Sequence, residues 1–147
     1  MGDFSLNKLS SLGGRQLSLI YGNSEVGEIP DGESSGTAIF IPGTALGALL
    51  SALGNKLWKG KVFNRSEGSL INKILGMRLV RARVFSGTSW SDGKQSIIID
   101  YLSTSLIAFF VRDEIRQIGA GQYLGKAYVR LPFGYRFCAL WFALDFL

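Results

Sequence analysis

The chain has 147 residues, of which 47% are hydrophobic and 18% are charged, and this balance excludes an intrinsically disordered protein. A single domain over residues 1–147 is the organisation expected for this length. The net charge is +5, but the basic residues are scattered and form no dense run, so we expect no nucleic-acid partner.

The side chains that the sequence lacks narrow its chemistry further. It contains no histidine, which removes Ser-His triads, histidine-ligated haem and most zinc sites, and we expect no metal and no cofactor. Cys138 is the only cysteine, and its apolar neighbours favour a small buried hydrophobe over a nucleophile. The sequence shows neither a secretory signal nor an apolar run of about 18 residues, which favours a cytoplasmic protein.

Residues 1–35 are predicted to form an N-terminal segment and a loop. Residues 16–21 fit either a short strand or a second helical turn, and residues 22–36 are typical of a loop, either ordered or acting as a mobile flap. Four apolar residues with a loose helical spacing precede the interrupting pair Gly13-Gly14, namely Phe4, Leu6, Leu9 and Leu12.

Residues 36–41 form the first predicted strand, and Pro42-Gly43 ends it with a turn. Thr44 can then N-cap a helix over residues 44–53, with Gly54-Asn55 as its stop signal. This helix is short and apolar on all sides, which favours a cap packed over one end of a barrel. Because basic and aromatic residues follow it, the alternative is a portal helix, with residues 45–61 in contact with a membrane surface.

The remaining chain predicts strands separated by turns. Residues 57–64 form a strand in which Trp58 and Lys61 fall on opposite faces, because side chains alternate. Residues 65–77 contain a turn and then a spacing typical of one or two helical turns. Turn signals such as Asp92-Gly93 separate the last five predicted strands, which are 78–85, 96–102, 111–118, 122–131 and 135–146. Seven or eight short strands indicate an antiparallel sandwich or barrel.

The strand over residues 111–118 has two different faces. One face carries alternating charge, which suits solvent, and the other places the carboxylate of Asp113 between apolar neighbours. Inside a barrel that carboxylate would be desolvated, which raises its pKa. The charged face comprises Arg112, Glu114, Arg116 and Ile118, and the other face comprises Val111, Asp113, Ile115 and Gln117.

The run Leu57-Trp58-Lys59-Gly60-Lys61 and the later meander with its Asp92-Gly93 turn resemble the lipocalin-like (calycin) group of antiparallel barrels. The resemblance implies a mainly β fold, in which an antiparallel meander closes into a small barrel capped by one or two short helices. It also implies an interior that holds an apolar small molecule.

Asp113 and Asp100 are the candidate catalytic residues if the protein is an enzyme, because a desolvated carboxylate can act as a general acid or base. The alternative for both is a structural role, either in an Asp–Arg pair or as a strand-end carboxylate that accepts hydrogen bonds from backbone N–H groups. Tyr128 and Arg130 share one strand face. This Tyr-x-Arg triplet resembles the pair that binds a carboxylate in fatty-acid-binding barrels. The alternative is that the whole face points to solvent. The candidate ligand-binding residues are Trp58, Arg81, Arg83, Tyr101, Tyr123, Tyr128, Arg130 and Trp141.

The leading functional hypothesis is binding of an apolar or amphipathic, lipid-like small molecule in a barrel cavity. The alternative is a cofactor-independent isomerase, cyclase or dehydratase that uses a buried Asp with Arg or Tyr partners. A third option is an oligomeric module. The last strand is apolar on both faces, so the cap helix, the N-terminal segment or a homodimer partner must cover its outer face.

Overall fold

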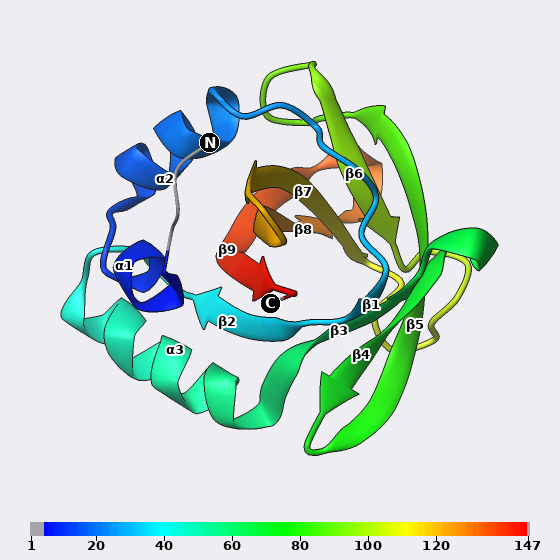
Figure 1. The fold of residues 1–147 in the computed structure, drawn as a ribbon, viewed down its shortest axis with the longest axis horizontal. Helices are drawn as coiled ribbons and strands as arrows, with labels where there is room; N and C mark the ends of the chain where they lie inside the picture. The colour runs from blue at the N-terminus through cyan, green and yellow to red at the C-terminus, as the bar shows by residue number, and fades with distance from the viewer. Residues whose placement is uncertain (1–4, 147) are drawn as a thin grey trace.

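The computed structural model describes residues 5–146, which form one antiparallel sheet with short helices around it (Figure 1). Phe4, which belongs to the helical spacing at the N-terminus, lies outside the described residues. The described strands are β1 (Gly32–Glu33), β2 (Ser35–Ile39), β3 (Trp58–Asn64), β4 (Ser69–Ile74), β5 (Met77–Thr88), β6 (Gln95–Asp100), β7 (Val111–Gly119), β8 (Gln122–Arg130) and β9 (Arg136–Asp145). The helices are α1 (Leu6–Ser10), α2 (Gly14–Gly22) and α3 (Ala45–Leu57), with 3-10 turns η1 (Arg65–Glu67) and η2 (Pro132–Gly134).

The sheet forms a nearly closed barrel because its two edges meet in one segment. The strand order is β1-β3-β4-β5-β6-β7-β8-β9-β2, and each neighbouring pair is antiparallel. Only Ser34 separates β1 from β2, so residues 32–39 pair with β3 on one side and with β9 on the other. The prediction of a mainly β, antiparallel barrel is therefore confirmed, and the architecture is compatible with a lipocalin-like fold.

The helices extend further than the sequence predicts. Residues 16–21 lie within α2, which decides between the strand and the helical turn. The helix predicted over 44–53 begins at its predicted cap, where Thr44 Oγ1 accepts a hydrogen bond from the Gly47 N–H (3.0 Å), but it continues to Leu57. Asn55, expected to stop it, bonds through its side chain to both the N–H and the carbonyl of Ala38, which anchors the last turns of α3 on β2.

The helical turns expected within residues 65–77 are wrong. Residues 69–74 form β4, which pairs with β3 on one side and with β5 on the other. A single helical turn is costly to nucleate, whereas a strand between two others gains ladder hydrogen bonds on both edges. The pairing therefore overrides a local spacing that fits a helix.

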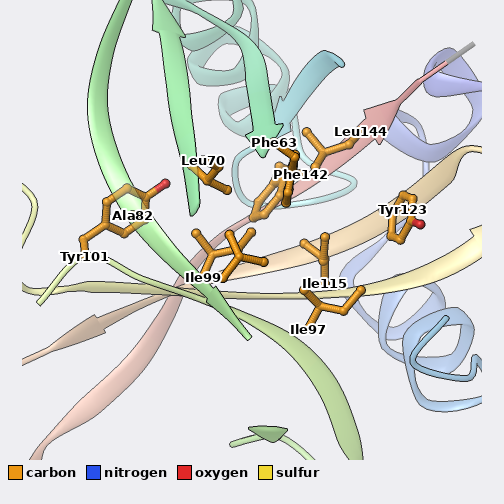
Figure 2. Packing of buried hydrophobic residues seen from close by; sticks show 11 residues of the cluster. Phe63, Leu70, Ala82, Ile97, Ile99, Tyr101, Ile115, Tyr123, Phe142 and Leu144 are labelled. Carbon is orange, nitrogen blue, oxygen red and sulfur yellow. The ribbon is translucent and has the colours of Figure 1, made fainter. Parts of the chain in front are cut away.

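An apolar cluster fills much of the barrel interior (Figure 2). At its centre the side chains of Ile97, Ile99 and Ile115 are fully buried. Strands β3 to β9 all contribute, and Tyr101 follows β6 directly. The buried members are Phe63, Leu70, Ala82, Val84, Ile97, Ile99, Tyr101, Ile115, Tyr123, Phe142 and Leu144.

A second cluster lies outside the barrel, where the two N-terminal helices cover one side of the sheet (Figure 1). Leu9 of α1 and Leu17 of α2 pack against outward side chains of the last strands, among them Leu124 and Trp141. The N-terminal segment is thus the element that covers the outer face of β9. The cover reaches only its second half, because residues 136–139 are exposed.

Two expectations about exposure are wrong. Cys138 lies in the uncovered half of β9 and is exposed, so it is no buried hydrophobe. The charged face of β7, expected to face solvent, is covered by α2 and by the connection between β5 and β6. Arg112 is 7% exposed, and Glu114 and Arg116 are 0% exposed.

The alternating strand directions sort the connections onto two ends of the barrel. One end, here called the mouth end, carries residues 40–57 with α3, the turn at 75–76, and the connections over 101–110 and 131–135. The opposite end carries the connections between β3 and β4, between β5 and β6, and between β7 and β8.

Candidate functional site

A pocket of about 370 Å³ opens at the mouth end of the barrel. Its walls are apolar and come from β2, α3, the β4–β5 hairpin, the 101–110 connection and strands β7 to β9. Four polar side chains line it as well, namely Lys61, Asn72, Tyr101 and Asp113. A larger depression of about 640 Å³ between α1 and α3 lies outside the barrel, and no buried charged side chain lines it.

A β-bulge brings two residues of β3 into this pocket. Trp58 pairs with Ile74 but Gly60 pairs with Lys73, so Lys59 is an extra residue and the alternation of faces is reset. Gly60 is needed there because its φ is 136° and a Cβ would lie 2.4 Å from the Ser34 carbonyl oxygen. The bulge therefore puts Trp58 and Lys61 on the same inner face, which strict alternation does not predict.

The Lys61 ammonium is the centre of a buried polar cluster. Its Nζ lies 2.7 Å from the Tyr101 hydroxyl, 2.9 Å from Asn72 Oδ1 and 3.0 Å from Asp113 Oδ2. An ammonium has three protons, so these three oxygens use its whole donor capacity. Lys61 is 3% exposed, as is Asp113, and such a charge is tolerated in the interior only with partners of this kind.

The other members of the cluster are also saturated, with one exception. Asn72 donates from Nδ2 to the Val80 carbonyl (3.0 Å) and to the Tyr101 hydroxyl (2.8 Å), and its Oδ1 also accepts from Trp58 Nε1 (3.1 Å). The Tyr101 hydroxyl donates to Asp113 Oδ2 at 3.4 Å. Among residues 5–146, none of the hydrogen bonds involves Asp113 Oδ1. Since Asp113 lines the pocket, Oδ1 is the acceptor that remains for a bound molecule.

Burial sets the protonation behaviour of the cluster. It raises the pKa of the Asp113 carboxyl, and the Lys61 charge and the Tyr101 hydroxyl offset only part of that effect. Burial alone lowers the pKa of Lys61, but the charge of Asp113 and the hydroxyl of Tyr101 outweigh it and raise that pKa. Burial also raises the pKa of Tyr101 to about 12. Asp113 is thus a stronger base than an ordinary aspartate, and it lies beside an ammonium that keeps its protons.

Aromatic rings surround the ammonium where oxygen atoms do not. Lys61 Nζ lies 5.5 Å from the Trp58 ring centre, 5.4 Å from that of Tyr101 and 5.3 Å from that of Phe142. Rings at this distance attract a cation through their negative faces. They also exclude water from the floor of the pocket, which strengthens the electrostatic interactions there.

The structure separates the two candidate catalytic aspartates, although their strands are neighbours. Asp113 faces the pocket, whereas Asp100 lies on the outer face of β6 and forms an ion pair with Arg130. Arg130 also donates to the Val111 carbonyl (3.1 Å). The arrangement of Asp100 is therefore the structural Asp–Arg pair considered from the sequence.

Of the candidate ligand-binding residues, Trp58 and Tyr101 line the pocket and the others do not. Arg81 and Arg83 are exposed outside the barrel. Tyr123 is inside but lies towards the opposite end, where its hydroxyl donates to the Glu28 carbonyl (2.6 Å). The outward residues are Tyr128, which packs edge-on against Trp90, Arg130, which pairs with Asp100, and Trp141, which packs beneath α2.

Lys61 and Asn72 belong to the site but were not among the candidates. A signal for Lys61 was present, because it shares a face with Phe63, and an apolar Phe63 predicts an inward face. Asn72 shares a strand face with Leu70 and Ile74, and this pattern predicts an inward amide once residues 69–74 are treated as a strand. The helical interpretation of that segment hid the signal.

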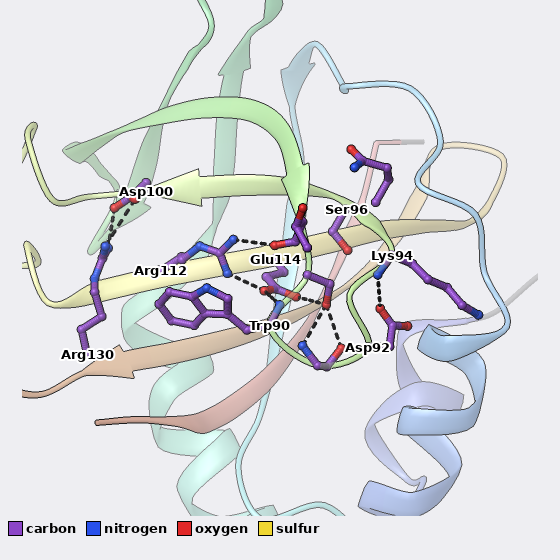
Figure 3. A network of polar contacts seen from close by, with 12 residues as sticks. Trp90, Asp92, Lys94, Ser96, Asp100, Arg112, Glu114 and Arg130 are labelled. Carbon is purple, nitrogen blue, oxygen red and sulfur yellow. Dashed lines mark hydrogen bonds and ion pairs between the residues drawn. The ribbon is translucent and has the colours of Figure 1, made fainter. Parts of the chain in front are cut away.

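A separate charged network lies outside the barrel, between β7, α2 and the β5–β6 connection (Figure 3). Glu114 accepts hydrogen bonds from Ser89 Oγ (2.6 Å), the Trp90 N–H (2.6 Å) and the Tyr21 hydroxyl (3.2 Å), and it pairs with Arg112. These contacts tie α2 and the β5–β6 connection to the barrel wall, so the network is structural.

Arg116 makes the same kind of link beside Glu114. It holds both oxygens of Asp92 at 2.6 and 2.7 Å, and its hydrogen bonds keep the pKa of that carboxyl low, at about 2. It also donates to the Tyr21 carbonyl at 3.0 Å. A guanidinium with this many acceptors is well compensated for its burial.

Within residues 5–146, no group of three or more carboxylate or cysteine side chains could hold a metal ion. In the same part of the chain, no helix is both long and apolar enough to cross a membrane. No protein-family model matches the chain, and searches of curated proteins and of solved structures find no match either.

Proposed function

We propose that this protein binds an apolar small molecule that presents one hydrogen-bond donor, such as a hydroxyl group, to Asp113. The observation that carries the proposal is the saturation of the polar cluster at the pocket floor. Lys61, Asn72 and Tyr101 have no donor to spare, and Oδ1 of Asp113 is the acceptor left over. The lipocalin-like architecture supports the same role, since such barrels hold apolar ligands.

The volume and the charge of the pocket restrict the ligand class. About 370 Å³ lies near the lower end of the range for small-molecule sites, roughly 300–1,000 Å³, so one compact ligand fits. The charges of Lys61 and Asp113 already compensate each other, so the carboxylate of a ligand would itself be an uncompensated negative charge in the pocket. We therefore expect a medium-chain alcohol to bind more tightly than the fatty acid of the same length.

Native mass spectrometry before and after organic extraction tests the proposal directly. We expect a retained mass that extraction removes, or, after addition of 1-decanol, a complex that decanoic acid does not give at neutral pH. Ala127→Phe should block binding because Ala127 lines the pocket, whereas Ala139→Phe, on the exposed half of β9, should leave it intact. Equal loss in both variants, or no complex with any apolar ligand, would exclude a binding role.

We infer a second candidate function, proton transfer without a cofactor, from the raised pKa of Asp113 in the same pocket. A desolvated carboxylate with a free oxygen can take a proton from a carbon next to a carbonyl and return it to another carbon, as an isomerase does. Lys61 would act as a positioning residue that keeps the carboxylate in place. The partner of the buried aspartate is then a lysine and a tyrosine rather than an arginine.

Conversion of 3-cyclohexen-1-one to its conjugated isomer, followed by ultraviolet absorption, tests this candidate. Asp113→Asn should remove the acceleration over buffer, because the amide cannot accept the proton. Asp100→Asn is the matched control, since Asp100 lies on the neighbouring strand outside the barrel, and it should keep the rate. Unchanged turnover in Asp113→Asn would show that the carboxylate is structural.

A further inference from the structure

Helix α3 has its apolar face turned away from the protein. Its inner face is small and polar: a Cβ on Gly47 would lie 2.0 Å from the Phe40 carbonyl oxygen, and Ser51 Oγ accepts from the Phe40 N–H at 2.8 Å. A surface helix usually shows the reverse pattern, with its apolar side on the core. The outer face is a stripe of leucines, each 36–59% exposed, namely Leu46, Leu49, Leu50, Leu53 and Leu57.

The other connections at the mouth end expose apolar side chains in the same way. Leu106 is 97% exposed and Ile107 is 78% exposed in the 101–110 connection, and Phe133 is 98% exposed between β8 and β9. Leu75 and Met77 flank the β4–β5 turn and are 62% and 54% exposed. These segments surround the pocket, because Ile107 lines it and α3 contributes Gly54 to its wall.

Exposed large apolar side chains are concentrated at this end. Four ranges make up the mouth end with its adjoining strand ends, and we call their exposed apolar side chains the apolar rim. Among the described residues, each exposed large hydrophobic side chain except Leu19 and Phe85 belongs to this rim. The ranges are 40–59, 73–81, 100–112 and 129–137. A concentration of exposed apolar side chains of this kind marks an interaction site.

The charge of the same four ranges is almost entirely positive. They contain eight Lys and Arg residues and one acidic residue, Asp100. Three of the eight are paired with acidic residues: Lys73 with Glu33, the buried Arg112 with Glu114, and Arg130 with Asp100. Lys56, Lys59 and Arg78 are exposed beside the leucine stripe and the β4–β5 turn. The remaining acidic residues of the chain lie outside these ranges. Apolar side chains framed by basic ones are complementary to an anionic lipid surface.

We propose that the apolar rim docks on the surface of an anionic lipid bilayer, with the mouth of the pocket facing the acyl chains. A second copy of this chain fits the same surface poorly. In a symmetric dimer the patch would face itself, so the basic residues would meet basic residues. The proposal concerns insertion into the interface, and it stands independently of which molecule the pocket holds.

Flotation with vesicles tests the docking. We expect the protein to float with vesicles of phosphatidylcholine and phosphatidylglycerol at 3:1, and much less with phosphatidylcholine alone. Lys56→Glu with Arg78→Glu should lower partitioning by about fivefold per residue at low salt. Ile107→Ser with Phe133→Ser should lower it by at least about tenfold, because two large apolar side chains no longer insert.

Two control variants distinguish docking through the rim from adhesion through any exposed apolar residue and from binding of lipid in the pocket. Leu19→Ser removes a leucine that is 58% exposed on α2, away from the mouth end, and should leave flotation unchanged. Ala127→Phe fills the pocket and should also float, so failure of ligand binding and failure of docking are distinguishable. The proposal is overturned if neither vesicle binds the protein, or if light scattering shows a dimer that the rim substitutions dissolve while flotation stays absent.

Discussion

Lys61 is the residue on which the interior chemistry depends. A buried ammonium loses its hydration, and here one hydroxyl, one amide oxygen and one carboxylate replace that hydration at 2.7–3.0 Å. Such a pair adds little stability relative to apolar residues of the same volume, but removal of one partner leaves an uncompensated charge. Stability alone therefore does not account for this buried pair at the floor of the pocket.

A double-mutant cycle on this pair should show strong coupling. We expect Lys61→Met to cost about 3–5 kcal/mol in urea unfolding at pH 7, Asp113→Asn to cost a similar amount, and the double variant to cost clearly less than the sum. In Lys61→Met the folded-state pKa of Asp113 is raised without its compensating charge. Its stabilising contribution is then largest in acid and is lost as the pH rises through that pKa, so acidification should recover stability.

The exposed pair between Lys73 and Glu33 is a matched control for the cycle. Its Nζ–Oε1 distance is also 3.0 Å, but Glu33 is solvent-exposed, so its substitution should change little. If the free-energy costs of the Lys61 and Asp113 substitutions were additive and as small as those for the surface pair, the buried groups would not interact in solution.

At the scale of elements, periodicity predicted where strands occur better than which way their side chains point. The turn signals placed the hairpins from β5 to β9, and alternation put Asp113 on the inner face of β7. The bulge at Gly60 could not be predicted in the same way, because the close approach of the Ser34 carbonyl that requires it comes from a neighbouring segment of the sheet that is distant in the sequence. Without the bulge, Trp58 and Lys61 cannot share the pocket.

Two other differences between the sequence-based prediction and the structure also arise from contacts between distant parts of the chain. Alternation shows which residues share a face, but it does not show what covers that face, so the charged side of β7 was expected in solvent although α2 covers it. The composition of α3 predicted an apolar helix, yet contacts such as Asn55 with Ala38 turn its small and polar side inward. In both cases a contact with another part of the chain determines which side of the element is buried, and the local sequence pattern carries no information about that contact.

On the scale of the whole molecule, the fold has two different ends. The N-terminal helices and the networks of Glu114 and Arg116 brace one side and the end opposite the mouth. The mouth end exposes apolar and basic side chains around the pocket.

The response of the whole fold to alkali should be steep. Burial raises the pKa of Tyr101 and of Tyr128 to about 12, and it also raises the pKa of Tyr21. The pKa of Lys61 is raised by its partners Asp113 and Tyr101, which outweigh the effect of its burial. All four shifts have the same sign: the unfolded chain releases its protons first as the pH passes 10, so the stabilising contribution is present below that pH and is lost above it. In acid the effects oppose one another, because the pKa of Asp92 is lowered and that of Asp113 is raised.

Urea unfolding followed by tryptophan fluorescence should therefore show a nearly constant free energy between pH 6 and 9. Above pH 10 it should fall by about 1.4 kcal/mol per pH unit for each buried tyrosine. Tyr101→Phe should remove one such contribution from the slope, whatever it does to the stability at pH 7. Tyr135→Phe changes a side chain that is 70% exposed at the mouth end and should leave the slope as it is. A flat free energy up to pH 11.5 would mean that the buried hydroxyl groups ionise as freely in the folded barrel as in the unfolded chain.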